Sequence, residues 1–124
     1  MDKWVRFYGS KDTEFVELRT TAQGEDGVAL SVRFEVDGAE RWQQQISATR
    51  AELQALAKWL DDFWNECPPA KLGDGRLQFV YSHREHIGEG YYQLEMDGRH
   101  VITAYEQLGT SNTFRAEKVR ELAG

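Results

Sequence analysis

The chain has 124 residues, of which 40% are hydrophobic, 29% charged and 12% aromatic. This length and composition predict one globular domain over residues 1–124 and exclude an intrinsically disordered chain. The formal net charge of −6 disfavours nucleic acid as a partner, because that affinity comes from clustered Lys and Arg. Cys67 is the single cysteine, so a disulfide within the chain is excluded.

Neither secretion nor insertion into a membrane is predicted. The start of the chain, Met1 to Trp4, lacks the basic stretch and the apolar run of a secretory signal. The apolar segments are all shorter than the roughly 20 residues that a membrane-spanning helix needs. We therefore expect a cytoplasmic protein that has no contact with a membrane.

The first half of the chain predicts four β-strands joined by turns. In residues 27–37 apolar side chains alternate with polar ones, as expected for a sheet with one buried and one hydrated face. Asp37-Gly38 then favours a tight hairpin turn, because both residues tolerate a positive φ angle. The predicted strands cover residues 4–8, 14–20, 27–37 and 41–47.

A long helix is predicted after the fourth strand. Thr49 and Glu52 form a predicted capping box, in which each side chain accepts a hydrogen bond from the other residue's backbone amide. Pro68 and Pro69 end the helix, because proline cannot donate the next backbone hydrogen bond. Apolar residues recur with the helical period of 3.6 at Leu53, Leu56, Ala57, Leu60, Phe63 and Trp64.

The second half predicts three more strands and a short C-terminal helix. Alternation resumes from Leu77, from Tyr92 and from Val101, and Asp97-Gly98 predicts a hairpin between the last two strands. The tail from 113 to 123 predicts a short helix. Its apolar side is expected to consist of Phe114, Val119 and Leu122.

These elements predict an α+β domain. We expect one curved, mainly antiparallel sheet of about seven strands, with the long helix packed on it and a short C-terminal helix. The order of elements lacks the repeated strand, helix and strand alternation of a parallel sheet.

The loop 82–90 between two predicted strands is the most suggestive local cluster. It carries His83, Glu85, His86 and Glu89, so metal binding and acid–base catalysis are both hypotheses. A zinc site would need three or four ligands on rigid elements, and this spacing lacks the helical frame of the usual His-Glu-x-x-His motif. The sequence therefore favours a hydrated polar turn, and we expect neither a metal nor a cofactor.

A surface that binds a partner protein is a further hypothesis. Trp59 lies at the margin of the helical stripe and Tyr91 on the strand face opposite Tyr92, so both rings are expected to be exposed. Acidic residues also gather at the end of the helix. An acidic surface favours a basic protein as the partner. The candidate partner-binding residues are Trp59, Asp61, Asp62, Glu66, Tyr91, His83, Glu85 and His86.

The order of elements resembles that of small bacterial immunity-type domains, which neutralise a cognate toxin. The resemblance consists of alternating strands up to Asp37-Gly38, the helical segment LAKWLDDFW at 56–64, the strand start GRLQF at 75–79 and a closing meander. It implies a binding protein that covers the functional surface of a toxin.

Three hypotheses of function follow. The first is a non-enzymatic protein-binding domain of the immunity type. The second is a small-ligand-binding domain, which the aromatic content favours, and the third is a metal-dependent or His-dependent enzyme that uses the loop from His83 to Glu89. Open sheet edges would also allow a second copy to pair, so a homo-oligomer is compatible with the sequence.

Overall fold

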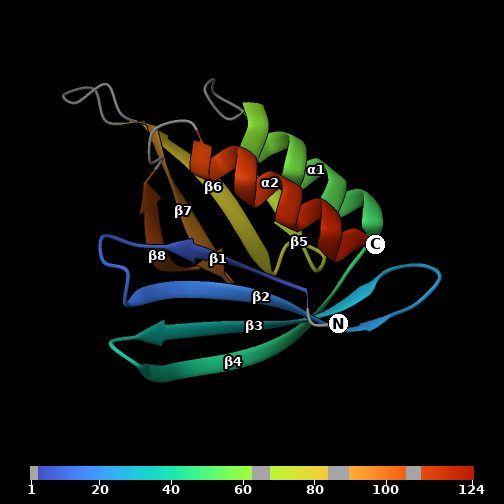
Figure 1. Cartoon of the computed structure of the whole chain (residues 1–124), viewed down its shortest axis with the longest axis horizontal. Helices are drawn as coiled ribbons and strands as arrows, with labels where there is room; N and C mark the ends of the chain where they lie inside the picture. The colour runs from blue at the N-terminus through green and yellow to red at the C-terminus, as the bar shows by residue number, and fades with distance from the viewer. Residues whose placement is uncertain (1–2, 63–67, 84–89, 106–109) are drawn as a thin grey trace.

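Two antiparallel sheets, each followed by a helix, form the domain (Figure 1). The structure is a computed structural model that describes residues 3–62, 68–83, 90–105 and 110–124. The first sheet has the order β1-β2-β3-β4 and the second the order β5-β6-β7-β8. The elements of the first half are β1 (Trp4–Tyr8), β2 (Glu14–Gln23), β3 (Val28–Val36), β4 (Ala39–Ala48) and α1 (Arg50–Asp62). Those of the second half are β5 (Ala70–Leu72), β6 (Leu77–His83), β7 (Gly90–Met96), β8 (Arg99–Tyr105) and α2 (Thr110–Ala123).

The α+β class and the antiparallel pairing are confirmed, whereas the single curved sheet is wrong. The predicted lengths of the helices are also wrong. Helix α1 has 13 residues and α2 has 14, so the C-terminal helix is not the shorter one. Alternation of apolar and polar residues shows which face of a strand is buried, but it does not show which strands pair. The short strand β5 was missed because three residues are too few to establish a period.

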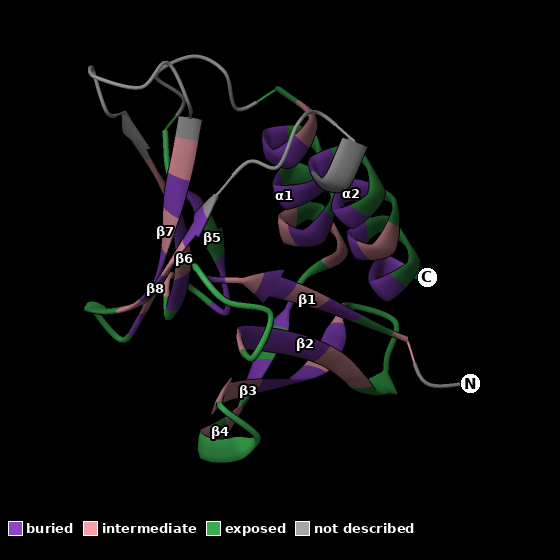
Figure 2. Ribbon diagram, turned by 60° about the vertical axis from the view of Figure 1, so that its left-hand side comes forward, coloured by how far each residue is buried: buried purple, intermediate pink, exposed green. Residues whose placement is uncertain are grey.

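The two sheets are set at an angle, and the helices lie side by side against them (Figure 2). The sheets approach each other at their edges, where β1 contacts β8 and β4 contacts β5. The helices run in opposite directions, because Nε of Arg50 at the start of α1 donates to the carbonyl of Ala123 at the end of α2. The core is therefore shared by both halves of the chain.

Aromatic rings from both sheets and from α1 form the centre of the core. Phe7 and Phe79 meet edge to face with ring centroids 4.9 Å apart, and Trp59 and Tyr92 do so at 5.4 Å. Phe7, Phe79 and Tyr92 are fully buried. These contacts join β1, β6, β7 and α1, so removing one ring would disturb both sheets.

The last hairpins of the two sheets have the same local structure. Asp37 and Gly38 have φ angles of 52° and 82°, and Asp97 and Gly98 have φ angles of 52° and 80°. The tight hairpin turn that was predicted for both Asp-Gly pairs requires two consecutive positive φ angles. Each hairpin also has a register shift two to three residues before its turn, after Phe34 in the first and after Leu94 in the second. The two halves thus share the order of four antiparallel strands followed by a helix, and their last hairpins are alike.

Candidate functional site

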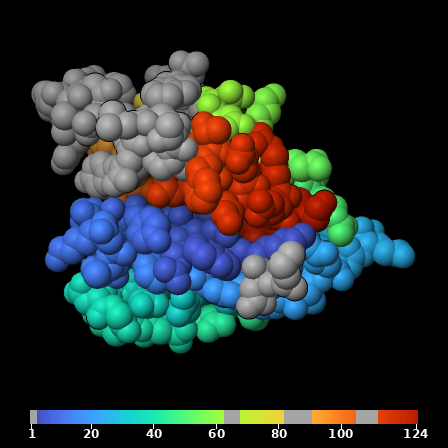
Figure 3. All heavy atoms as spheres, in the orientation of Figure 1, coloured from blue at the N-terminus to red at the C-terminus, as the bar shows by residue number. Residues whose placement is uncertain are grey.

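The side chains of strand β1 point alternately into the core and toward α2 and the surface. Val5 and Phe7 are buried, so Trp4, Arg6 and Tyr8 lie on the opposite face by the two-residue period of a strand. Figure 3 shows α2 and the first two strands next to each other on one face of the molecule. The site described below lies where this edge of the sheet meets the helix.

A shallow groove of about 180 Å³ runs between β1 and α2. The two exposed large hydrophobic side chains of the described residues are Trp4, which is 38% exposed, and Phe114, which is 59% exposed, and both line this groove. A single exposed ring is ordinary, but two that share one hollow form an apolar contact surface. We call this the β1–α2 groove, and it is lined by Trp4, Val5, Arg6, Tyr8, Phe114, Arg115 and Lys118.

Cationic side chains of the groove lie over its aromatic rings. The Arg6 guanidinium carbon lies 5.0 Å from the ring centre of Trp4. Nζ of Lys118 lies 5.7 Å from the ring centre of Trp4 and 5.5 Å from that of Phe114, so this ammonium group links β1 to α2. Contacts of this kind stabilise the cation's position by roughly 0.5–1 kcal/mol each at exposed sites.

Arg115 fixes the helix against the strand. Its Nε donates to the backbone carbonyl of Arg6 at 3.0 Å, and its guanidinium carbon lies 5.9 Å from the ring centre of Tyr8. Arg115 is 9% exposed, which is low for an arginine. The groove walls are therefore held together by a buried charged group.

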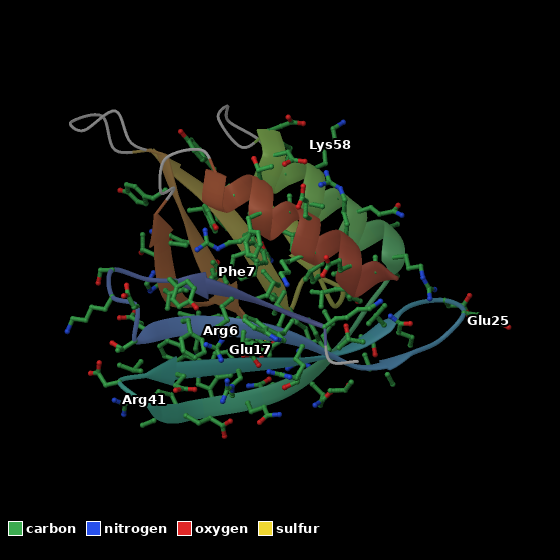
Figure 4. All side chains as sticks on the ribbon, in the orientation of Figure 1. Arg6, Phe7, Glu17, Glu25, Arg41 and Lys58 are labelled. Atoms are coloured by element: carbon green, nitrogen blue, oxygen red, sulfur yellow. The ribbon has the colours of Figure 1, made fainter. Side chains whose placement is uncertain are left out.

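Next to the groove, the outer face of the first sheet, which also carries Arg6, has one glutamate surrounded by three arginines. Glu17 is only 3% exposed, and its carboxylate accepts hydrogen bonds from Nε of Arg6 at 2.9 Å, Nε of Arg19 at 3.0 Å and Nη2 of Arg33 at 3.2 Å. The strand register explains this arrangement, because Arg6, Glu17 and Arg33 face each other directly across β1, β2 and β3. Figure 4 shows the Arg6 and Glu17 side chains next to each other on this sheet.

The arginines change the acidity of Glu17. Burial by itself would raise the pKa of this carboxyl, but hydrogen bonds from Arg6 and Arg19 and the charges of Arg19 and Arg33 outweigh it, so the pKa is lowered. Glu17 therefore stays ionised at neutral pH. Arg33 also pairs with a second carboxylate, because its Nη1 lies 3.1 Å from Oε2 of Glu35.

Trp59 was expected at the surface, and this prediction is wrong. The side chain is 7% exposed, its ring meets Phe79 and Tyr92 edge to face, and its Nε1 donates to the carbonyl of Pro68 at 3.0 Å. The margin of the helical stripe faces the second sheet, whereas a single sheet was expected from the sequence. Tyr91 lies on the face opposite Tyr92, as expected, and it is half-buried.

The other predicted partner-binding residues are only partly within the described chain. Asp61 accepts a hydrogen bond from Nη2 of Arg120 on α2, and Asp62 beside it is exposed. His83 ends β6, but its side chain lies outside the described part of the structure. Also outside it lie Phe63, Trp64, Glu66, Glu85, His86 and Glu89.

The metal and catalytic hypotheses for the loop from His83 to Glu89 therefore stay predictions. Within the described ranges, His, Cys, Asp and Glu do not gather in groups of three or more that could hold a metal ion.

A second, larger hollow lies between the last hairpins of the two sheets. Its volume is about 530 Å³, and its apolar part consists of Phe34, Trp42, Met96 and Val101. Phe34 and Trp42 have ring centroids 5.9 Å apart and are half-buried. Polar groups at its rim come from Gln44, Asp97, Arg99 and His100.

The β1–α2 groove was not predicted from the sequence, because Phe114 was expected on the core side of the last helix. The buried side of α2 consists instead of Asn112, Arg115, Ala116, Val119, Leu122 and Ala123. These positions recur every three to four residues, and Phe114 does not fall among them. Strict counting of the helical period would therefore have placed Phe114 outside the core, four residues from Lys118.

Among the helices of the described residues, none is both long and apolar enough to cross a membrane. Comparison of the chain with protein-family models, with curated proteins and with solved structures finds no match in any of the three.

Proposed function

We propose that the protein is a non-enzymatic protein-binding domain and that it contacts its partner through the β1–α2 groove. One observation carries this proposal. Trp4 and Phe114, 110 positions apart in the chain, are brought together at the surface with a lysine between their rings. Tryptophan, tyrosine and arginine dominate the binding energy of protein interfaces, and exposed aromatic surface is stabilised when a partner covers it.

The more specific form of the proposal is an immunity-type protein that neutralises a toxin by covering its functional surface. This form rests on the resemblance in the order of elements. The basic partner and the cytoplasmic location expected from the sequence belong to it as predictions. Of the acidic residues at the end of α1, Asp61 is already engaged with Arg120, so a basic partner would have to compete for it.

A small-ligand-binding domain is the second candidate. It is favoured by the hollow between the two sheets, whose aromatic pair Phe34 and Trp42 and polar rim offer the mixture of surfaces that ligand sites have. An enzyme that uses the loop from His83 to Glu89 is the third candidate.

Gentle purification from the native host, followed by light scattering and native mass spectrometry, tests the proposal. The wild type is compared with a double variant, Trp4→Ser with Phe114→Ser, and with Lys58→Ser as a control on the exposed side of α1. We expect a protein of defined stoichiometry on the wild type and on the control, and its loss from the double variant.

Three other outcomes are informative. A wild-type protein that carries no partner contradicts the proposal, and a bound small molecule favours the second candidate. A homodimer that the double variant dissociates would identify the partner as a second copy of the chain.

A further inference from the structure

We infer that the β1–α2 groove binds an acidic segment of a partner protein, in which an aromatic or aliphatic side chain is flanked by carboxylates. This inference rests on the proposed function and specifies its partner. It departs from the basic partner that the net charge of −6 predicts. The reason is that the charge at the contact surface, and not the charge of the whole chain, decides which groups can be buried there.

The groove has three cationic side chains and, among the described residues that line it, no carboxylate. Two of the cations stand at its open sides, since Arg6 is 31% and Lys118 is 32% exposed. Within the described part of the chain, Arg6 pairs with the carboxylate of Glu17, which also contacts Arg19 and Arg33. Nζ of Lys118 lies 4.0 Å from Oε2 of Glu121. The Glu121 side chain is well exposed, so this ion pair is weak. Both cations can therefore accept another carboxylate.

The shape of the groove sets the apolar part of the partner segment. A volume of about 180 Å³ between the rings of Trp4 and Phe114 has room for one large side chain and not for a whole helix. A leucine or phenylalanine placed there would be covered by both rings. Carboxylates one or two residues away on the same segment would then reach Arg6 on the strand side and Lys118 on the helix side. A lysine or arginine in these places would meet like charges instead.

The inference can be tested with short peptides before any partner is known. The probe is a fluorescein-labelled peptide with the sequence Gly-Ser-Glu-Glu-Phe-Glu-Glu-Ser-Gly, and its binding is followed by fluorescence anisotropy. Matched probes replace all four Glu by Gln, all four Glu by Lys, or Phe by Ala. We expect the acidic aromatic probe to bind, and each matched probe to bind about tenfold more weakly or not at all. Binding should weaken as salt is raised, because the charged groups are partly exposed.

Variants of the protein assign the binding to the groove. Lys118→Glu and Phe114→Ser should each weaken binding of the acidic probe by about fivefold or more. Lys58→Glu makes the same charge reversal at an exposed position of α1 and should leave binding unchanged. Phe114 is 59% exposed, so its replacement by Ser is expected to preserve the fold, which circular dichroism checks.

Three results would overturn the inference: absence of binding of the acidic probe at about 1 mM, equal binding of the lysine probe, or equal effects of Lys118→Glu and Lys58→Glu. None of them depends on the proposed function. If the native partner is lost from the Trp4→Ser and Phe114→Ser double variant but the acidic probe does not bind, protein binding stands and the acidic segment is rejected. If the probe binds as expected but the purified wild type carries no partner, the proposed function fails and the chemistry of the groove stands.

Discussion

Arg6 and Glu17 face each other across β1 and β2, and Nε of Arg6 donates to Oε2 of Glu17 at 2.9 Å. The same guanidinium group lies 4.3 Å from the ring centre of Phe15 and takes part in the β1–α2 groove. Arg6 therefore links the buried carboxylate of the sheet to the surface that we propose for binding. Replacing Glu17 should therefore affect both the first sheet and the β1–α2 groove.

Glu17→Gln is expected to lower the free energy of unfolding. The amide keeps the shape of the side chain but removes the charge that holds Arg6, Arg19 and Arg33 together. Because these arginines are partly exposed, we expect a loss of about 1–3 kcal/mol and not the larger cost of breaking a fully buried pair. Urea denaturation at pH 7 measures it. Glu40→Gln at an exposed position of β4 is the control, and an equal loss in both variants would contradict the role of Glu17.

The contribution of Glu17 to stability should disappear in acid. The pKa of Glu17 is lowered in the folded protein, so the folded state favours the ionised carboxylate more than the unfolded state does. The stabilisation is present above the unfolded pKa, near 4.5, and is lost as the pH falls through the lower folded pKa. The difference in unfolding free energy between wild type and Glu17→Gln should therefore shrink below pH 4.5. A difference that stays constant down to the lowest pH at which the protein folds would refute this.

Two tryptophans should respond very differently to replacement by alanine. Trp59 is 7% exposed and contacts the central aromatic cluster, so Trp59→Ala should cost about 3–5 kcal/mol. Trp4 is 38% exposed, and Trp4→Ala should cost about 1 kcal/mol or less while weakening partner binding. Thermal and chemical unfolding of both variants measure the contrast. Similar losses at the two positions would mean that Trp4 has a structural role.

Gly27 should not tolerate a side chain, whereas Gly24 in the same loop should. A Cβ atom at Gly27 would lie 2.6 Å from the carbonyl oxygen of Ala48, and the nearest atom to a Cβ at Gly24 is the carbonyl oxygen of Gly27 at 3.8 Å. Gly27→Ala must therefore move the end of β4, at a cost of about 1–3 kcal/mol. Gly24→Ala should stay within about 0.5 kcal/mol of the wild type. Equal stability of the two variants would show that the loop adapts freely.

Local features of the fold could be predicted from the sequence because neighbouring residues determine them. The capping box of α1 is present, with the Thr49 amide 2.8 Å from Oε1 of Glu52 and the Glu52 amide 3.0 Å from Oγ1 of Thr49. Both hairpin turns occur at the predicted Asp-Gly pairs. In each case the residues that make the interaction lie within four positions of each other.

The division into two sheets and the groove could not be predicted, because they depend on residues far apart in the chain. The burial of Trp59 depends on Phe79 and Tyr92 in the second sheet. The groove depends on a contact between positions 4 and 118. Of these features, the exposure of Phe114 could have been predicted, because the apolar residues of α2 recur with a helical period that leaves out Phe114.

The order of strands in the two sheets has a consequence for the rate of folding. Every strand pair in the described sheets joins strands that are neighbours in the sequence, from β1 with β2 to β7 with β8. Proteins whose contacts are close in sequence fold faster than those with distant pairings, because less chain entropy is lost before the contacts form. We therefore expect this β-rich chain to fold faster than a Greek-key sandwich of the same length. The slowest contacts to form should be those between β1 and β8 and between α1 and α2, which join the two halves.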